Sequence, residues 1–209
     1  MRSSYIATSF FVAYGGGVTF RRSTLALAIL GLLENGPLHP YGIQRLIKQW
    51  GKDQVVNVGQ RTSLYRMIVR LEEAGLITAG AIEQDERYPE RTVYHLTDEG
   101  REVCREWLAE ILTTPRNEYP EFPAGLSFVM LLPPETAGEL LGQRRERLTK
   151  RIAELQLELR SEENGKPVPR FALLETEYQV AVAVAEAKWI DSVLHDLRTG
   201  TLTWTPGPA

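Results

Sequence analysis

Arginine and short polar side chains gather in one stretch of this 209-residue sequence. Arginines on one helix face can hold phosphates or bind guanine with paired hydrogen bonds, which discriminates between bases by roughly 1–3 kcal/mol. The alternative is a solvated amphipathic helix face. The stretch from Tyr41 to Arg70 has a net charge of +5, although the formal net charge of the whole chain is -3. It contains one acidic residue, Asp53, and six basic residues, which are Arg45, Lys48, Lys52, Arg61, Arg66 and Arg70.

Residues that could support catalysis or hold a metal are scattered. His39, His95 and His195 stand far apart and form no HExxH arrangement, and a single cysteine, Cys104, gives no zinc-ligand spacing. Ser127 lacks the second glycine of a nucleophile elbow and is predicted to pack. Cys104 is predicted to be a small buried residue, with redox sensing as the alternative. We therefore predict no enzyme, no metal and no cofactor.

Hydrophobic periodicity predicts the elements that position the basic stretch. Ser23 or Thr24 caps a first helix, and Asn35-Gly36-Pro37 ends it. The predicted elements that follow are a helix with Ile43, Leu46, Ile47 and Trp50 inward, a basic helix from Gln60 to Ala74, strands at 76–83 and 91–96 around a charged tip, and a helix opened by Thr97. This order is typical of a winged helix-turn-helix, whose third helix enters the major groove of DNA.

The predicted DNA contacts follow from their places in these elements. The arginines of the third helix are expected to give specificity, and the polar residues at its start to set the register. Tyr65 has two open roles, since its hydroxyl can bond a phosphate while its ring can pack on the neighbouring helix. The candidate DNA-binding residues are Gln60, Arg61, Thr62, Ser63, Tyr65, Arg66 and Arg70, with Arg45, Arg87 and Arg91 added from the second helix and the wing.

The sequence after Leu112 changes character. A proline-containing connector is predicted over 113–123, followed by a helical domain over 124–209. A helix over 135–160 carries an a/d coiled-coil seam, and a second long helix has one apolar face. The predicted dimerisation residues are Leu141, Leu148, Ile152, Leu155, Leu159, Tyr178 and Trp189. Packing of the two helices within one chain is the alternative.

A ligand cavity could use the larger aromatic side chains, because aromatic surfaces can sandwich planar molecules. Trp107, Phe128, Tyr178 and Trp189 are the candidate effector-binding residues, and packing in the core is the alternative for each.

The first twenty residues differ from the rest of the chain. Residues 1–20 suit a disordered or weakly docked extension, a misplaced start or, less well, a secretory signal.

The longest apolar stretch, Leu25–Leu33, is about half of the ~20 residues that a membrane crossing needs. One cysteine fits a reducing compartment. We therefore expect a cytoplasmic protein that does not enter the membrane.

Separate motifs stand in order within the first 112 residues, and they are Leu27–Leu33, Pro37–Ile43, Ser63–Arg66, Leu71–Ile77 and Tyr94–Arg101. Together these motifs resemble the PadR family of transcriptional regulators. The resemblance covers 21–112 closely and implies a winged helix-turn-helix domain there, with a C-terminal helical region for dimerisation. It matches the recognition helix to 60–74 and the wing to 84–91, although Asp85, Glu86 and Glu90 make this wing less basic than the pattern.

The resemblance also implies a function. It indicates a homodimer that binds a palindromic double-stranded operator, usually as a repressor, and that leaves the operator when a small-molecule effector binds. The expected fold class is mainly α with a small β-hairpin. A different class of function stays open at this point: a winged-helix module that binds proteins and makes no contact with DNA.

Overall fold

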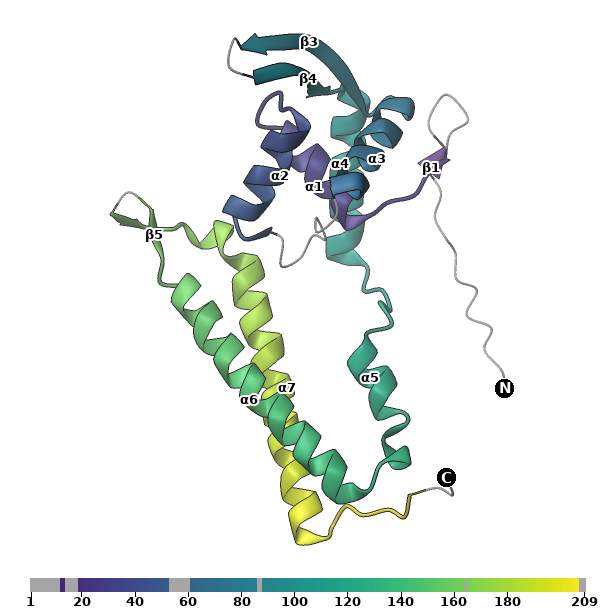
Figure 1. Cartoon of the computed structure of the whole chain (residues 1–209), viewed down its shortest axis with the longest axis vertical. Helices are drawn as coiled ribbons and strands as arrows, with labels where there is room; N and C mark the ends of the chain where they lie inside the picture. The colour runs from purple at the N-terminus through teal and green to yellow at the C-terminus, as the bar shows by residue number, and fades with distance from the viewer. Residues whose placement is uncertain (1–11, 14–18, 53–60, 86–87, 164, 207–209) are drawn as a thin grey trace. The chain divides into compact units, whose positions relative to one another are not determined.

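The computed structural model describes residues 12–13, 19–52, 61–85, 88–163 and 165–206 (Figure 1). The chain divides into two compact units, Met1–Arg116 and Asn117–Ala209. The first unit contains four helices in its described part, and a long antiparallel helix pair dominates the second.

The first unit has the predicted order of helix, helix, helix, hairpin and helix. Its elements are β1 (Val12–Ala13), β2 (Thr19–Phe20), α1 (Thr24–Leu33), α2 (Pro40–Gln49), α3 (Arg61–Glu73), β3 (Ile77–Asp85), β4 (Tyr88–Leu96) and α4 (Asp98–Thr113). β1 pairs with β2, and β3 pairs with β4, both antiparallel.

Side-chain caps fix where three of these helices begin. The Ser23 hydroxyl accepts a hydrogen bond from the Ala26 amide at 3.1 Å, and Nδ1 of His39 accepts one from the Gly42 amide at 2.8 Å. Thr97 Oγ1 accepts from the Gly100 amide at 2.9 Å at the start of α4. Each cap satisfies an amide that has no partner within the helix, which is worth about 1 kcal/mol.

One apolar core joins all four helices of the first unit to the base of the hairpin. Its most enclosed side chains are Ala26, Ile29, Leu30, Ile43, Ile47, Leu64, Ile68, Leu71, Leu76, Ile77 and Val103. Burying a side chain of the Leu or Ile size stabilises a fold by about 1.5–3 kcal/mol, so this cluster supplies much of the driving force for folding. The prediction that Trp50 points inward is wrong: α2 ends at Gln49, and the Trp50 side chain is 49% exposed at the cap.

The hairpin is fastened to the helices through its second strand. Leu38 forms a β-bridge with Tyr94 of β4, with mutual backbone hydrogen bonds of 3.1 and 2.9 Å. Thr97 Oγ1 also donates to the Gly75 carbonyl at 2.8 Å, directly after α3. These bonds hold the base of the wing beside the end of α3.

The second unit begins with a short helix that the sequence did not predict. Its elements are α5 (Glu121–Leu126), the 3₁₀ turn η2 (Val129–Leu131), α6 (Pro134–Glu158), β5 (Glu162–Glu163), β6 (Lys166–Pro167), the 3₁₀ turn η3 (Arg170–Ala172) and α7 (Leu174–Thr199). α5 therefore starts within the predicted extended connector. Pro123 is compatible with this helix because it lies in the first turn, where no helical N–H partner is lost.

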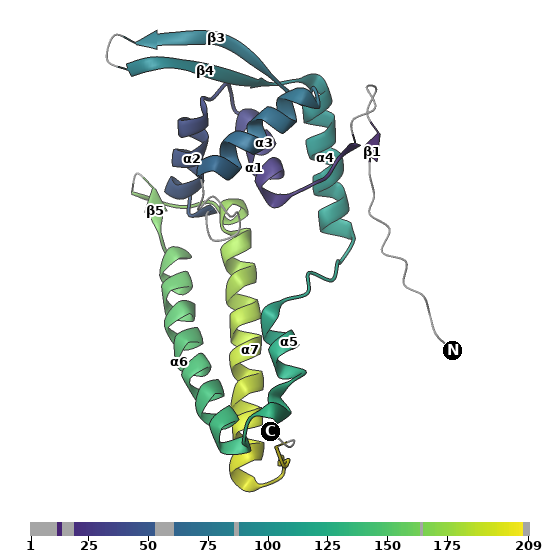
Figure 2. The ribbon, with the colours of Figure 1, turned by 45° about the vertical axis from the view of Figure 1, so that its right-hand side comes forward.

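α6 and α7 lie antiparallel and side by side (Figures 1 and 2). Arg145 Nε donates to Asp191 at 2.8 Å, and Arg151 donates to Gln179 at 3.0 Å, so ion pairs and hydrogen bonds cross between the helices. Leu141 and Leu155 of the predicted seam are buried within the one chain. The connection between the two helices contains the paired strands β5 and β6 and the turn η3, and α7 folds back along α6.

Within the residues that the structure describes, no helix is both long and apolar enough to cross a membrane.

Candidate nucleic-acid interface

α3 presents one face to the core and another to solvent. Leu64, Ile68 and Leu71 are buried, as their spacing predicted. Thr62 and Arg66 are exposed, and Tyr65 is 53% exposed on the same outward side. The side chain of Ser63 is half-buried. An exposed, basic helix next to a hairpin is the arrangement that a winged helix uses in the major groove.

Arg66 and Arg45 are predicted arginine contacts that have no partner in the rest of the described chain. Both side chains are exposed, and neither forms an ion pair or hydrogen bond with a described residue. A guanidinium without a protein partner keeps its five donors for a phosphate or a base edge.

Arg70 has different surroundings at the end of α3. Its guanidinium lies over the ring of Phe20, 5.1 Å from the ring centre, while the side chain remains exposed. Phe20 is itself buried and stacks on Trp107 at 5.8 Å between ring centres. The segment before α1 therefore supports the last turn of α3, and the core includes a residue that the sequence assigned to the N-terminal extension.

Tyr65 of α3 and Tyr94 of β4 are tyrosines of the first unit. The pKa of Tyr94 in β4 is raised, mainly by burial and further by Glu72 and Tyr65. Neither of the two predicted roles of Tyr65 is favoured, because half of its side chain faces solvent.

Two of the predicted contacts, Gln60 and Arg87, lie outside the described residues. Arg61 is the first residue of α3, and the backbone of Arg91 in β4 pairs with that of Glu83 in β3.

Sequence reasoning missed Val69. This side chain is 49% exposed on α3, three residues after Arg66 and four after Tyr65, and so belongs to the outward face. An apolar side chain on a recognition helix can contact the methyl group of thymine. A 100° helical projection of 61–73 would have revealed it, because Val69 falls outside the stripe of Leu64, Ile68 and Leu71.

The predicted effector residues are divided between the two units. Trp107 is 3% exposed in the core of the first unit. Phe128, Tyr178 and Trp189 belong to the second unit, where each keeps an exposed side chain and Trp189 meets Phe122 edge to face at 6.0 Å.

The predicted dimerisation residues also fall into two classes. Leu141 and Leu155 are buried, and Leu148, Ile152 and Leu159 are half-buried along the inner part of the α6–α7 pair. Tyr178 and Trp189 remain exposed on α7, together with Leu174 and Val182. We call these four side chains the α7 stripe; their spacing puts them on one side of the helix.

Cys104 is half-buried, and burial is the main cause that raises the pKa of its thiol. A raised pKa disfavours the reactive thiolate. Among the described residues no group of His, Cys, Asp and Glu is arranged to hold a metal ion.

Comparison with known proteins relates this geometry to one family. Residues 29–106 match the Transcriptional regulator PadR-like family. The chain is 27% identical over 137 residues to the Negative transcriptional regulator PadR of Bacillus subtilis (strain 168), which covers 63% of this chain and 71% of that protein.

Solved structures extend the likeness to the whole fold. Bacillus subtilis PadR in complex with operator DNA has a TM-score of 0.67 and 23% identity, and the match covers 84% of this chain and 99% of that one. The same protein in complex with p-coumaric acid has a TM-score of 0.66 and 22% identity, with coverage of 84% and 99%. The predicted fold class, mainly α with a small β-hairpin in a winged helix-turn-helix, is confirmed.

Proposed function

We propose that this chain, whose residues 29–106 match the PadR-like family of transcriptional regulators, binds a palindromic operator through α3 and acts as a dimeric, effector-responsive repressor in the cytoplasm. The family is one of regulators and not of enzymes. The proposal assigns DNA binding to residues 21–112 and dimerisation to residues 124–209, joined by the connector over 113–123.

The exposed face of α3 is the main observation that supports DNA binding. Arg66 is exposed without a partner in the described chain, Thr62 and Tyr65 flank it, and the helix belongs to a stretch with a net charge of +5. The chain as a whole is acidic, so its global charge would not draw it to DNA. Affinity therefore has to come from this local surface.

The apolar side chains of α7 that remain exposed on the α6–α7 pair support dimerisation. Tyr178 is 71% exposed, and Trp189, Leu174 and Val182 continue an apolar strip along α7. Such strips usually mark an interface between proteins. A twofold dimer would present two copies of α3 to two operator half-sites, as a palindrome requires.

Repression and release by a small molecule are proposed from the relatives. The Bacillus subtilis relative is named a negative transcriptional regulator, and its structures include complexes with operator DNA and with p-coumaric acid. An effector that binds only the DNA-free conformation would lower operator affinity by population shift.

A gel-shift assay with DNA from upstream of the chain's own gene tests the proposal. We expect a retarded band at low salt that random DNA does not compete away, and an affinity that falls steeply as salt rises. A folded dimer that retards no fragment at low salt would contradict the proposal and would favour a winged-helix module that binds proteins.

A further inference from the structure

Val69 is an exposed apolar side chain on the face of α3 that the proposed function places against DNA. Its side chain is 49% exposed, whereas Leu64, Ile68 and Leu71 of the same helix are at most 1% exposed. A valine on an exposed helix surface contributes no hydrogen bond and favours the helix less than alanine does. Neither the core nor the stability of α3 therefore accounts for a valine at this position.

The neighbours of Val69 on α3 are residues proposed to contact DNA. Arg66 and Tyr65 precede it by three and four residues. Thr62 precedes it by seven residues, or two helical turns. This spacing places the four side chains on one face of the helix, and all four are exposed. Val69 thus belongs to the surface that would enter the major groove.

Glu73 limits this surface at the end of α3. It follows Val69 by four residues on the same face and is exposed. Its carboxylate would repel the DNA phosphates, which are themselves negatively charged. Along the helix, the face of α3 therefore changes from a cation at Arg66 through an apolar side chain at Val69 to an anion at Glu73.

The major groove offers one methyl group to such an apolar side chain. Every base pair presents hydrogen-bonding groups there, and only the A·T pair adds the C5 methyl group of thymine. A valine cannot donate to a phosphate or to a base edge, and it would remove water from any phosphate that it covered. The C5 methyl group of thymine is thus the group in the groove that favours contact with Val69.

We propose that Val69 is a specificity-determining residue, which packs on the C5 methyl group of a thymine in each operator half-site. A helix rises ~1.5 Å per residue, so Val69 lies ~4.5 Å along α3 from Arg66, close to the ~3.4 Å between neighbouring bases of a strand. A helix that lies along the groove would present the two side chains to neighbouring base pairs. This proposal rests on the proposed function and deepens it by naming a base that the operator contains.

Replacing thymidine by deoxyuridine in the DNA tests the contact, because the two bases pair identically and differ only in the C5 methyl group. The upstream fragment of the gel-shift assay is prepared with each nucleoside at every thymine position. Fluorescence anisotropy then gives the Kd of the full chain for both fragments. We expect the wild-type chain to bind the deoxyuridine fragment about fourfold more weakly for each buried methyl group, and so about sixteenfold for two half-sites.

Val69→Ala separates this contact from the effect of the methyl groups on DNA shape. A shape effect depends on the DNA and would persist in the variant, whereas a contact with the valine side chain would be lost. We expect the variant to bind the thymidine fragment more weakly than the wild type does, and to discriminate between the fragments by about twofold or less. Alanine is the better helix former, so the variant should fold, and urea unfolding checks this.

Val184→Ala is the matched control. Val184 is 44% exposed on α7 and lies outside both α3 and the α7 stripe. Its substitution removes the same atoms from an exposed helix surface and should leave the discrimination of the wild type unchanged. An equal loss of discrimination in both variants would show that the effect is not local to α3 and would overturn the proposal.

Three further outcomes would also overturn the proposal. The first is equal affinity of the wild-type chain for the two fragments, and the second is full discrimination by Val69→Ala. The third is discrimination that is lost in Thr62→Ser, which removes only the methyl group of Thr62, and kept in Val69→Ala. The proposed function survives all three, because the thymidine fragment is still bound. If the wild-type chain bound neither fragment at low salt, the proposed function would fail, and this inference with it.

Discussion

Arg66 and Arg70 stand one turn apart on α3 and have different surroundings. Arg66 is exposed with no partner in the described chain, whereas Arg70 lies over the Phe20 ring at 5.1 Å. A free arginine must lose side-chain entropy when it binds DNA, and a stacked one is already partly ordered. We therefore expect Arg66 to contribute a direct contact and Arg70 to depend on Phe20 for its position.

Arg66→Ala should weaken operator binding by about tenfold or more, because an arginine contact with a base is worth roughly 1–3 kcal/mol. Fluorescence anisotropy with labelled operator measures the change. Lys188→Ala, which removes an exposed cation from α7, is the control and should bind normally. Undiminished binding by Arg66→Ala would remove this residue from the interface.

Phe20→Leu should lower operator affinity by roughly two- to fivefold, since an exposed cation–π contact is worth about 0.5–1 kcal/mol. Leucine keeps an apolar side chain in the core, so a thermal melt serves as a check on folding. In an Arg70→Ala background the same substitution should have little further effect on affinity. An equal loss in both backgrounds would show that Phe20 does not act through Arg70.

At the scale of elements, α4 approaches the base of the hairpin too closely for any side chain at Gly100. A Cβ there would lie 2.0 Å from the Leu76 carbonyl oxygen, which also accepts from the Thr97 amide at 3.2 Å. This contact joins the start of β3 to the first turn of α4. The glycine is thus required by packing and not by its backbone angles.

Gly100→Ala should destabilise the first unit by at least about 2 kcal/mol, because the buried backbone on both sides has to move apart. Gly31→Ala is the matched control, since nothing lies within 4 Å of a Cβ at that position of α1. This variant should be neutral or more stable by up to about 1 kcal/mol. Urea unfolding measures both changes, and a Gly100→Ala variant as stable as the wild type would refute the contact.

The elements of the first unit were predictable because each has a local signal. Ser23, Thr97 and the apolar spacing of α1 and α3 specify helices without reference to the rest of the chain. Contacts between distant segments have no such signal, so the Leu38–Tyr94 bridge and the packing of Phe20 on Trp107 were not foreseen. The seam of α6 was recognised, but heptad spacing alone does not say whether α7 or a second chain covers it.

At the scale of the whole molecule, the uncovered surface of α7 bears on assembly. Tyr178→Glu should convert the dimer to a monomer, because it puts a charge in the middle of the α7 stripe. Val184→Glu is the control: Val184 is also exposed on α7, at 44%, but lies off the stripe by helical spacing. Sedimentation velocity distinguishes the two, and a dimeric Tyr178→Glu variant would place the interface elsewhere.

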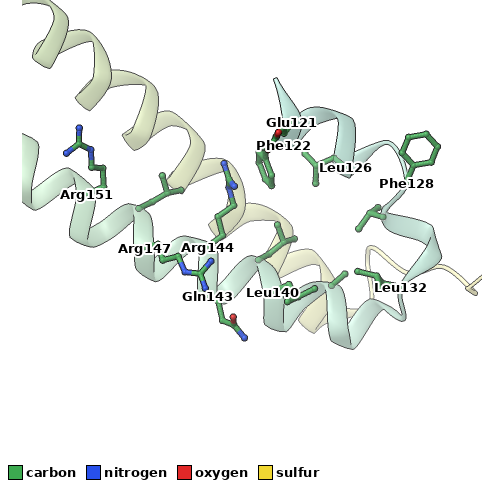
Figure 3. A pocket seen from close by; sticks show the side chains of 15 residues that line it. Glu121, Phe122, Leu126, Phe128, Leu132, Leu140, Gln143, Arg144, Arg147 and Arg151 are labelled. Carbon is green, nitrogen blue, oxygen red and sulfur yellow. The ribbon is translucent and has the colours of Figure 1, made fainter. Parts of the chain in front are cut away.

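The net charge of the whole chain gives a misleading indication about DNA binding. The net charge of -3 averages a basic stretch around α3 with an acidic remainder. The positions of the arginines on α3 were predictable from the sequence, whereas their partners were not, because Phe20 reaches Arg70 from before α1. The groove between α5, η2 and α6 (Figure 3) was not predicted, because one of its walls comes from α5, a helix that begins inside the expected connector.

Hydroxyl-radical footprinting of the full chain on its operator shows whether a dimer reads DNA through two copies of α3. Two copies of α3 in a symmetric dimer should protect two half-sites whose centres lie about one helical turn apart, or ~34 Å. Arg66→Ala should weaken both protections together. A single protected stretch, or no protection at low salt by a folded dimer, would contradict an operator-binding dimer that reads DNA through α3.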